Sequence, residues 1–65
     1  MKLPDFIKKE RKKAGLTQQE LADKAGVGIH FIRDIEQGKT NLQTDKVNTV
    51  LYLFGYILGP VPINR

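Results

Sequence analysis

Four side chains between positions 29 and 34 carry the groups needed to recognise the edges of base pairs. His30 and Arg33 are able to donate hydrogen bonds to guanine O6 and N7, and Asp34 is able to accept one from cytosine N4. Ile29 offers an alkyl group that fits a thymine methyl. Residues three and four apart are neighbours on a helix, so we expect these four to share its outer face. Taken singly, each is also an ordinary surface side chain.

Asp34 is the least expected of these residues, because phosphates repel a carboxylate that faces DNA. It must therefore meet a cytosine amino group, or orient Arg33 or His30.

Other kinds of chemistry are not expected. The 65 residues include no cysteine and one histidine, which excludes disulfides and makes a structural metal site unlikely by composition. Paired carboxylates, a nucleophile with its base and a phosphate-binding glycine loop are all missing from the sequence. We therefore predict a protein that is not an enzyme and that binds no cofactor or metal.

The distribution of charge suits a polyanionic partner. The formal net charge is +4, and the 8–13 segment, KKERKK, contains five of the eleven basic residues. A solvated helix face is the alternative interpretation of this run. The apolar run 50–58 is about half the length that crosses a bilayer, and the N-terminus lacks the pattern of a signal peptide. We expect a complete, cytoplasmic protein.

Two short helices must position the 29–34 residues. Thr17 and Glu20 form a T-x-x-E capping box, which predicts a helix beginning at Thr17. Gly26 ends that helix, and a second one starts after Gly28 and stops at Gly38. This order of helix, glycine turn and helix is the helix-turn-helix pattern.

Two further helices complete the expected core. Pro4 suits the first turn of a helix that runs to Ala14. A last helix starts at Thr44 or Asp45 and closes at Gly55. We also expect Arg11 and Glu36, both on inward-leaning positions, to form a partly buried salt bridge; two unrelated surface charges are the alternative.

Polar residues at the ends of the two central helices are suited to hold a nucleic-acid backbone. Free N–H groups and the helix dipole favour an anion at the start of the 17–25 helix. The loop after the next helix leaves it where a phosphate backbone would pass. Such contacts position a protein and carry no sequence information. The residues expected to make them are Gln18, Gln19, Lys39, Thr40 and Asn41.

The C-terminal segment 56–65 has the composition of a short strand, although its two prolines restrict a strand to a sheet edge. A strand needs a partner for its backbone, and the simplest partner is the same segment of a second copy. Disorder from residue 60 onward is the alternative. The residues expected to contribute to a dimer interface are Tyr52, Leu53, Tyr56, Ile57 and Leu58.

The segment GLTQQELADKAGV, followed by IEQGK, resembles the Cro/C1-type (Xre) helix-turn-helix of phage and bacterial repressors. The resemblance covers residues 6–55 and implies an all-α, lambda-repressor-like domain of four helices. It also implies base contacts from Ile29, His30 and Asp34, with Arg33 nearby, phosphate contacts from residues 18 and 39–41, and the Arg11–Glu36 salt bridge. Gly28 departs from the family, which usually has a serine or threonine there.

The ending DKVNTVLYLFGYILGPV is similar to HipB-like and Y4mF-like antitoxins. That similarity implies paired tails, autoregulation of an operon and a HipA-like kinase toxin as partner. We therefore expect a helix-turn-helix domain over residues 1–55, a dimerisation tail over 56–65, and a homodimeric, sequence-specific repressor of a palindromic DNA operator. The alternatives are a protein-interaction module that neutralises a toxin and binds DNA only secondarily, or a stand-alone phage-type regulator.

Overall fold

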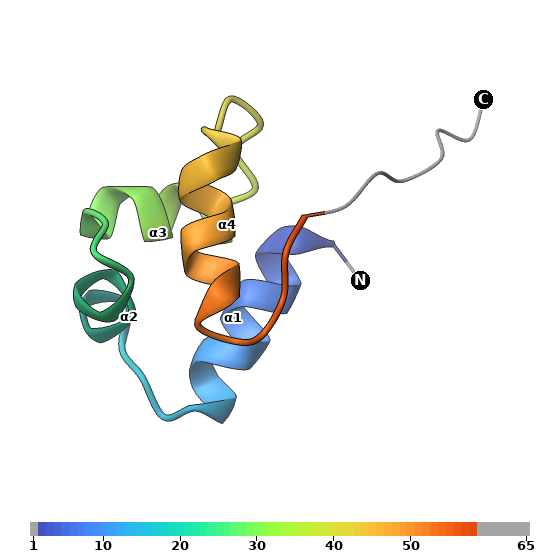
Figure 1. Ribbon diagram of the computed structural model, residues 1–65. Helices are drawn as coiled ribbons and strands as arrows, with labels where there is room; N and C mark the ends of the chain where they lie inside the picture. The colour runs from blue at the N-terminus through green and yellow to red at the C-terminus, as the bar shows by residue number, and fades with distance from the viewer. Residues whose placement is uncertain (1, 59–65) are drawn as a thin grey trace.

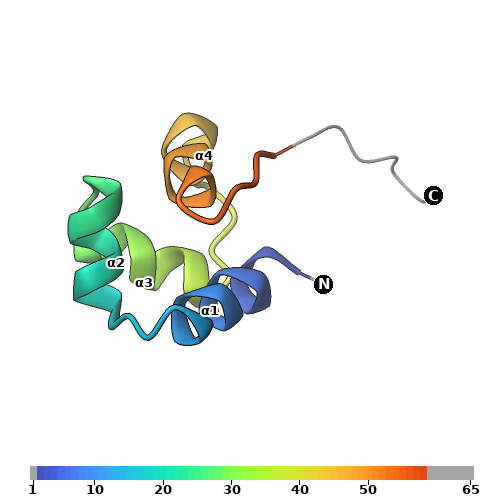
Figure 2. The same cartoon turned by 60° about the horizontal axis from the view of Figure 1, so that its bottom comes forward.

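The computed structural model describes residues 2–58, which form four α-helices (Figure 1). The prediction of an all-α, four-helix domain is confirmed. Helices α1, α2 and α3 lie next to one another, and α4 crosses one side of the three (Figure 2). The helices are α1 (Leu3–Lys13), α2 (Gln18–Ala25), α3 (Ile29–Glu36) and α4 (Thr44–Tyr52).

A single apolar core lies where the four helices meet. Each helix contributes one apolar stripe, and residues from all four stripes lose almost all contact with water. This burial is the main stabilising contribution in a chain of this size. The buried apolar residues are Ile7 from α1; Leu21, Ala22 and Ala25 from α2; Ile32 and Ile35 from α3; and Val47, Val50 and Leu51 from α4.

Both ends of α2, and the turn that leads from it to α3, follow directly from the sequence. The Thr17 hydroxyl accepts a hydrogen bond from the Glu20 N–H at 3.0 Å, and the Glu20 carboxylate accepts one from the Thr17 N–H at 2.9 Å. This is the predicted capping box. Gly26 ends α2 in the left-handed region, with a φ of +70°, where a side chain would be strained. The chain then turns, and Gly28 is the N-cap of α3.

Helix α4 ends at Tyr52, three residues before the predicted end at Gly55. The last turn tightens instead of continuing as an α-helix. The Leu53 N–H donates to the Val50 carbonyl at 3.2 Å, and the Phe54 N–H donates to the Leu51 carbonyl at 2.9 Å. Gly55 therefore closes a tightened turn that follows the helix.

The segment 56–58 is not a strand, and the rest of the predicted strand, 59–65, lies outside the described residues. The Leu58 N–H donates to the Asn48 side-chain carbonyl at 2.7 Å, so a side chain of α4 takes the place of a partner strand at this position. The Tyr56 ring meets the Phe6 ring edge to face, with 4.8 Å between the ring centroids. These contacts hold the segment against α1 and α4. Within residues 2–58, none of the helices has the length and apolar character to span a bilayer.

Candidate nucleic-acid interface

Two of the four predicted base-contacting residues are exposed on the outer face of α3. His30 and Arg33 are three residues apart and point to solvent. Asp34 is half-buried and pairs with Lys39, which was expected to contact phosphate and not Asp34. The distance from Lys39 Nζ to Asp34 Oδ1 is 3.6 Å, so Asp34 orients neither Arg33 nor His30 through an ion pair of its own in this structure.

Ile29 does not lie on the exposed face where we expected it. It is half-buried and packs against the core cluster. The reason is the helical period: Ile29 lies three residues before Ile32 and seven before Glu36, and both of these are buried. Ile29 therefore occupies the border between the inner and outer faces of α3, and only part of its side chain is open to a ligand.

The expected ion pair between Arg11 and Glu36 is present and ties α1 to α3. Arg11 Nε donates to Glu36 Oε2 at 2.7 Å, and Arg11 Nη2 donates to Glu36 Oε1 at 3.0 Å. The third guanidinium nitrogen, Nη1, donates to the carbonyl of Leu16 at 2.9 Å. The side chains are only 12% and 3% exposed, respectively. A bidentate pair this deeply buried fixes the angle between the two helices.

Burial raises the pKa of Glu36, but the hydrogen bonds from Arg11 and Gln18 and the positive charges of Arg11 and Lys8 outweigh it. The pKa of Glu36 therefore lies below its ordinary value of 4.5. A carboxylate whose pKa is lower in the folded state stabilises the fold above the unfolded-state pKa. That stabilisation is lost as the pH falls through the folded-state pKa.

We accordingly expect this contribution to disappear only below pH 4.5, the ordinary pKa of the group. Urea unfolding of the wild type and of Glu36→Gln, followed from about pH 7 to about pH 3, measures it as the difference between their two pH profiles. The gap in stability should narrow in acid. A constant gap across the range would contradict the pairing.

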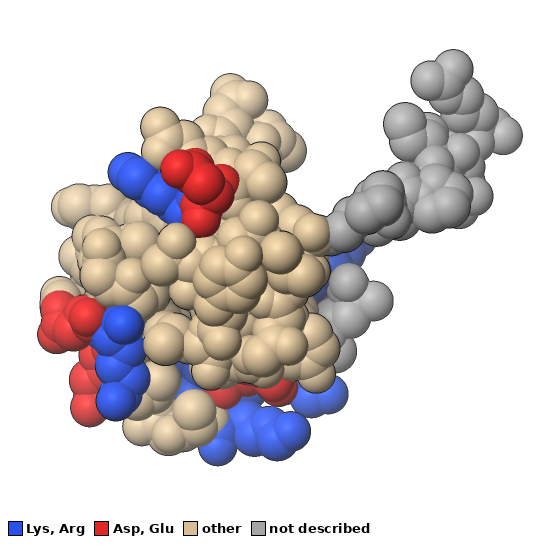
Figure 3. Space-filling model, viewed as in Figure 1, with Lys and Arg blue, Asp and Glu red and all other residues tan. Residues whose placement is uncertain are grey.

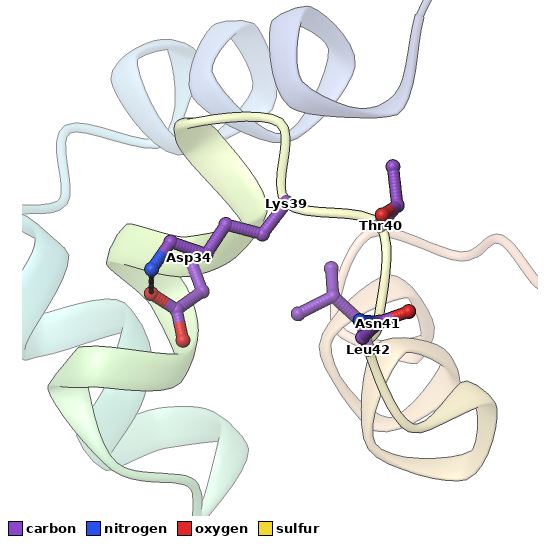
Figure 4. A pocket seen from close by; sticks show the side chains of 5 residues that line it. All are labelled: Asp34, Lys39, Thr40, Asn41 and Leu42. Atoms are coloured by element: carbon purple, nitrogen blue, oxygen red, sulfur yellow. Dashed lines mark ion pairs between the residues drawn. The ribbon is translucent and has the colours of Figure 1, made fainter.

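The predicted phosphate-contacting residues lie at two places around α3. At the start of α2, the Gln18 amide donates to Glu36 Oε1 at 3.3 Å, and the Gln19 amide donates to Asp23 Oδ1 at 2.9 Å. Both side chains are thus held by the domain itself. At the end of α3, an open hollow of about 270 Å³ separates the helix from the following loop (Figure 4). Its lining residues are Asp34, Lys39, Thr40, Asn41 and Leu42.

Charge is unevenly distributed over the surface. Figure 3 shows the molecule in the same view as Figure 1. Basic side chains gather at its lower edge, over the C-terminal half of α1, whereas the central face over α4 is mostly uncharged. The exposed lysines of α1 are Lys8, Lys9, Lys12 and Lys13. The residues predicted for a dimer interface are themselves uncharged and 40–61% exposed: Tyr52, Leu53, Tyr56, Ile57 and Leu58.

Gly28 leaves α3 without a side-chain cap. Its φ of −74° suits any residue, and a Cβ built there would have no atom within 4 Å. We therefore expect Gly28→Ser to raise the free energy of unfolding by a few tenths to about 1 kcal/mol, by adding a cap and restricting the unfolded chain.

Thermal unfolding measures this effect, and Gly26→Ser is the matched control. Gly26 has a φ of +70°, so serine there should destabilise by about 1–2 kcal/mol. If both variants changed stability in the same direction, backbone conformation would not be the cause.

Two contacts at this surface and beside it were not expected from the sequence. The Asp34–Lys39 pair follows from the turn that ends α3, and the glycine at position 38 is the signal that could have revealed it. The role of Asn48 in holding Leu58 has no comparable signal, because the two residues belong to different elements.

Comparison with known proteins agrees with this geometry. A family model described as helix-turn-helix matches residues 7–51, which run from the middle of α1 to the last turn of α4. The chain is also 51% identical, over 45 residues, to an uncharacterized HTH-type transcriptional regulator, y4mF, of Sinorhizobium fredii (strain NBRC 101917 / NGR234). The matched part covers 69% of this chain and 59% of that relative, so the chain spans about three fifths of the relative's length. The fold, the capping box and the matched segment together place this chain in the Xre-type helix-turn-helix family.

Proposed function

We propose that this domain is a sequence-specific, DNA-binding transcriptional repressor. The observation that carries the proposal is the exposed face of α3, where His30 and Arg33 project side by side from a helix that the core and the Arg11–Glu36 pair hold rigidly. A helix of this kind fits the major groove, where each base pair presents a distinct pattern of donors and acceptors. Ile29 and Asp34, at the borders of this face, complete the proposed set of base contacts.

We expect the nucleic-acid backbone to be held at two places near the C-terminal end of α3, since the Gln18 amide at the start of α2 donates to Glu36, the last residue of α3. At the start of α2, Gln18 and Gln19 present backbone N–H groups that have no acceptor within the helix, because these are its first two positions. Beyond α3, the loop offers Lys39, Thr40 and Asn41, all exposed. Phosphate contacts at these two places would fix the position of α3 in the groove.

The active form we propose is a homodimer on a palindromic operator. Two α3 helices related by a twofold axis would enter major grooves about 34 Å apart. The exposed apolar residues of 52–58 support a protein interface. The similarity of the C-terminal segment to HipB-like and Y4mF-like antitoxins supports the finer proposal of an autoregulating antitoxin whose partner is a HipA-like kinase toxin.

Selection from a randomised duplex library, followed by titration of the selected duplex and of random duplex at several salt concentrations, tests the proposal. We expect the selected duplex to bind more tightly at moderate salt. Affinity for both should fall steeply with salt, because protein cations release counterions from the phosphates. Equal affinity for the two duplexes would refute sequence-specific repression.

A second candidate function is a protein-interaction module in which DNA binding is secondary. The specific observation in its favour is the uncharged apolar surface of residues 52–58. Light scattering after size exclusion, on the chain alone and co-expressed with the product of the neighbouring gene, separates the two. A stable complex combined with no sequence preference on DNA would favour this second function.

A further inference from the structure

The turn that ends α3 brings Lys39 back beside Asp34. Gly38 adopts a φ of +81°, and two backbone hydrogen bonds close the turn. The Gly38 N–H donates to the Ile35 carbonyl at 3.0 Å, and the Lys39 N–H donates to the Asp34 carbonyl at 3.1 Å. This is the Schellman pattern, which places the second residue after the C-cap against the last turn of the helix. The nearness of the two side chains is therefore built into the backbone.

The ion pair itself is weak. Its distance is 3.6 Å, and the side chains of Lys39 and Asp34 are 61% and 39% exposed. An exposed pair of this kind adds little to stability. A phosphate, with its own charge and strong acceptor oxygens, competes well for the same ammonium group. Figure 4 shows the pair at the edge of the hollow that both residues line, and the exposed Lys39 side chain has solvent on its other side.

Removing Lys39 from Asp34 would leave one uncompensated carboxylate on α3. The helix has only two acidic residues, Asp34 and Glu36. Glu36 is buried and neutralised by Arg11, so its charge does not face a ligand. Asp34 lies one position after Arg33, and side chains at that spacing do not face each other on a helix. Lys39 is thus the cation that shields Asp34 in the free protein.

We propose that Asp34 determines specificity mainly by penalising wrong sequences, and that Lys39 controls the penalty. This inference rests on the proposed function. When α3 enters the major groove, Lys39 moves from Asp34 to a phosphate. The Asp34 carboxylate is then without its ion-pair partner and is desolvated. A base that presents an exocyclic amino group there, cytosine N4 or adenine N6, satisfies it. Any other base leaves a buried charge unpaired and is disfavoured.

The first test compares wild type, Asp34→Asn and the control Asp45→Asn on random duplex and on the duplex that wild type selects. Asp45 is an exposed acidic residue in the first turn of α4, so its substitution changes the net charge equally. We expect Asp34→Asn to bind random duplex about tenfold more tightly, which corresponds to one relieved charge. Its preference for the selected duplex, which is the ratio of the two affinities, should shrink by a similar factor. The control Asp45→Asn should change this ratio and the affinity for random duplex by no more than about twofold.

The second test asks where Lys39 goes. If its ammonium moves to a phosphate, Lys39→Gln should reduce the slope of log affinity against log salt by about one, in the wild type and in Asp34→Asn alike. An unchanged slope would mean that Lys39 stays on Asp34 in the complex, and it would overturn the exchange. Circular dichroism melts of all variants should agree closely, because neither side chain is buried and an exposed ion pair adds little to stability.

The outcomes also separate this inference from the function on which it rests. If wild type shows no preference for any duplex, the proposed function fails. If wild type shows a preference but Asp34→Asn leaves random binding unchanged, or weakens both duplexes equally, only the penalty assigned to Asp34 is overturned.

Discussion

Replacing Arg11 with methionine is expected to lower the free energy of unfolding by about 3–5 kcal/mol. The substitution leaves the Glu36 carboxylate, 3% exposed, without its two charged hydrogen bonds. It also removes the donor to the Leu16 carbonyl in the turn between α1 and α2. A chain of this size has about 3–10 kcal/mol of stability in total, so the substitution removes a large fraction of it.

Two controls assign this loss to the buried charge. Lys12→Met removes a cation from the exposed side of the same helix and should cost no more than about 0.5 kcal/mol. The double variant Arg11→Met/Glu36→Leu removes both charges, and it should recover most of the loss, because an apolar pair of similar volume replaces a buried ion pair with little penalty. Urea unfolding measures all three. A double variant as unstable as Arg11→Met would show that packing, and not the charge, was lost.

The second large effect concerns binding. Arg33→Ala is expected to weaken binding to the preferred duplex by about 1–3 kcal/mol, the value of one good contact to a base edge. Arg33 is the only lysine or arginine among the eight residues of α3, and its side chain is exposed. Binding to random duplex should weaken far less, since only a charge is lost there. The ratio of the two affinities should therefore fall.

Titration of both duplexes at one salt concentration gives that ratio. Lys46→Ala, an exposed cation of α4, is the control for the change in net charge and should leave the ratio unchanged. If Arg33→Ala weakened both duplexes equally, Arg33 would be a phosphate contact instead of a base contact.

Most of the fold was predictable because its signals are local. The capping box at Thr17 and the glycine at position 26 each fix one helix end by backbone hydrogen bonding, and both act as expected. The Arg11–Glu36 pair was predictable for a different reason, since a charge on an inward position demands a partner.

The errors arose where a position is decided by tertiary geometry. Ile29 has the residue type of a thymine contact, but its place relative to Ile32 puts it against the core. The end of α4 depends on how its last turn tightens, which Gly55 alone does not determine. The pairing of Asp34 with Lys39 spans a turn, so helical spacing within α3 could not indicate it.

The position of residues 53–58 has a consequence for avidity. They lie against α1 and α4, on the side of the molecule away from α2 (Figure 2). A second copy joined through them would therefore leave α3 uncovered, and one assembly would carry two reading helices. Once α3 of one copy is bound, α3 of the other copy meets DNA at a high effective concentration, which is in the millimolar range where a short flexible segment connects two binding units. The stiffness of the connection between the two copies would then determine how strongly the protein discriminates between operators that differ in the distance between their half-sites.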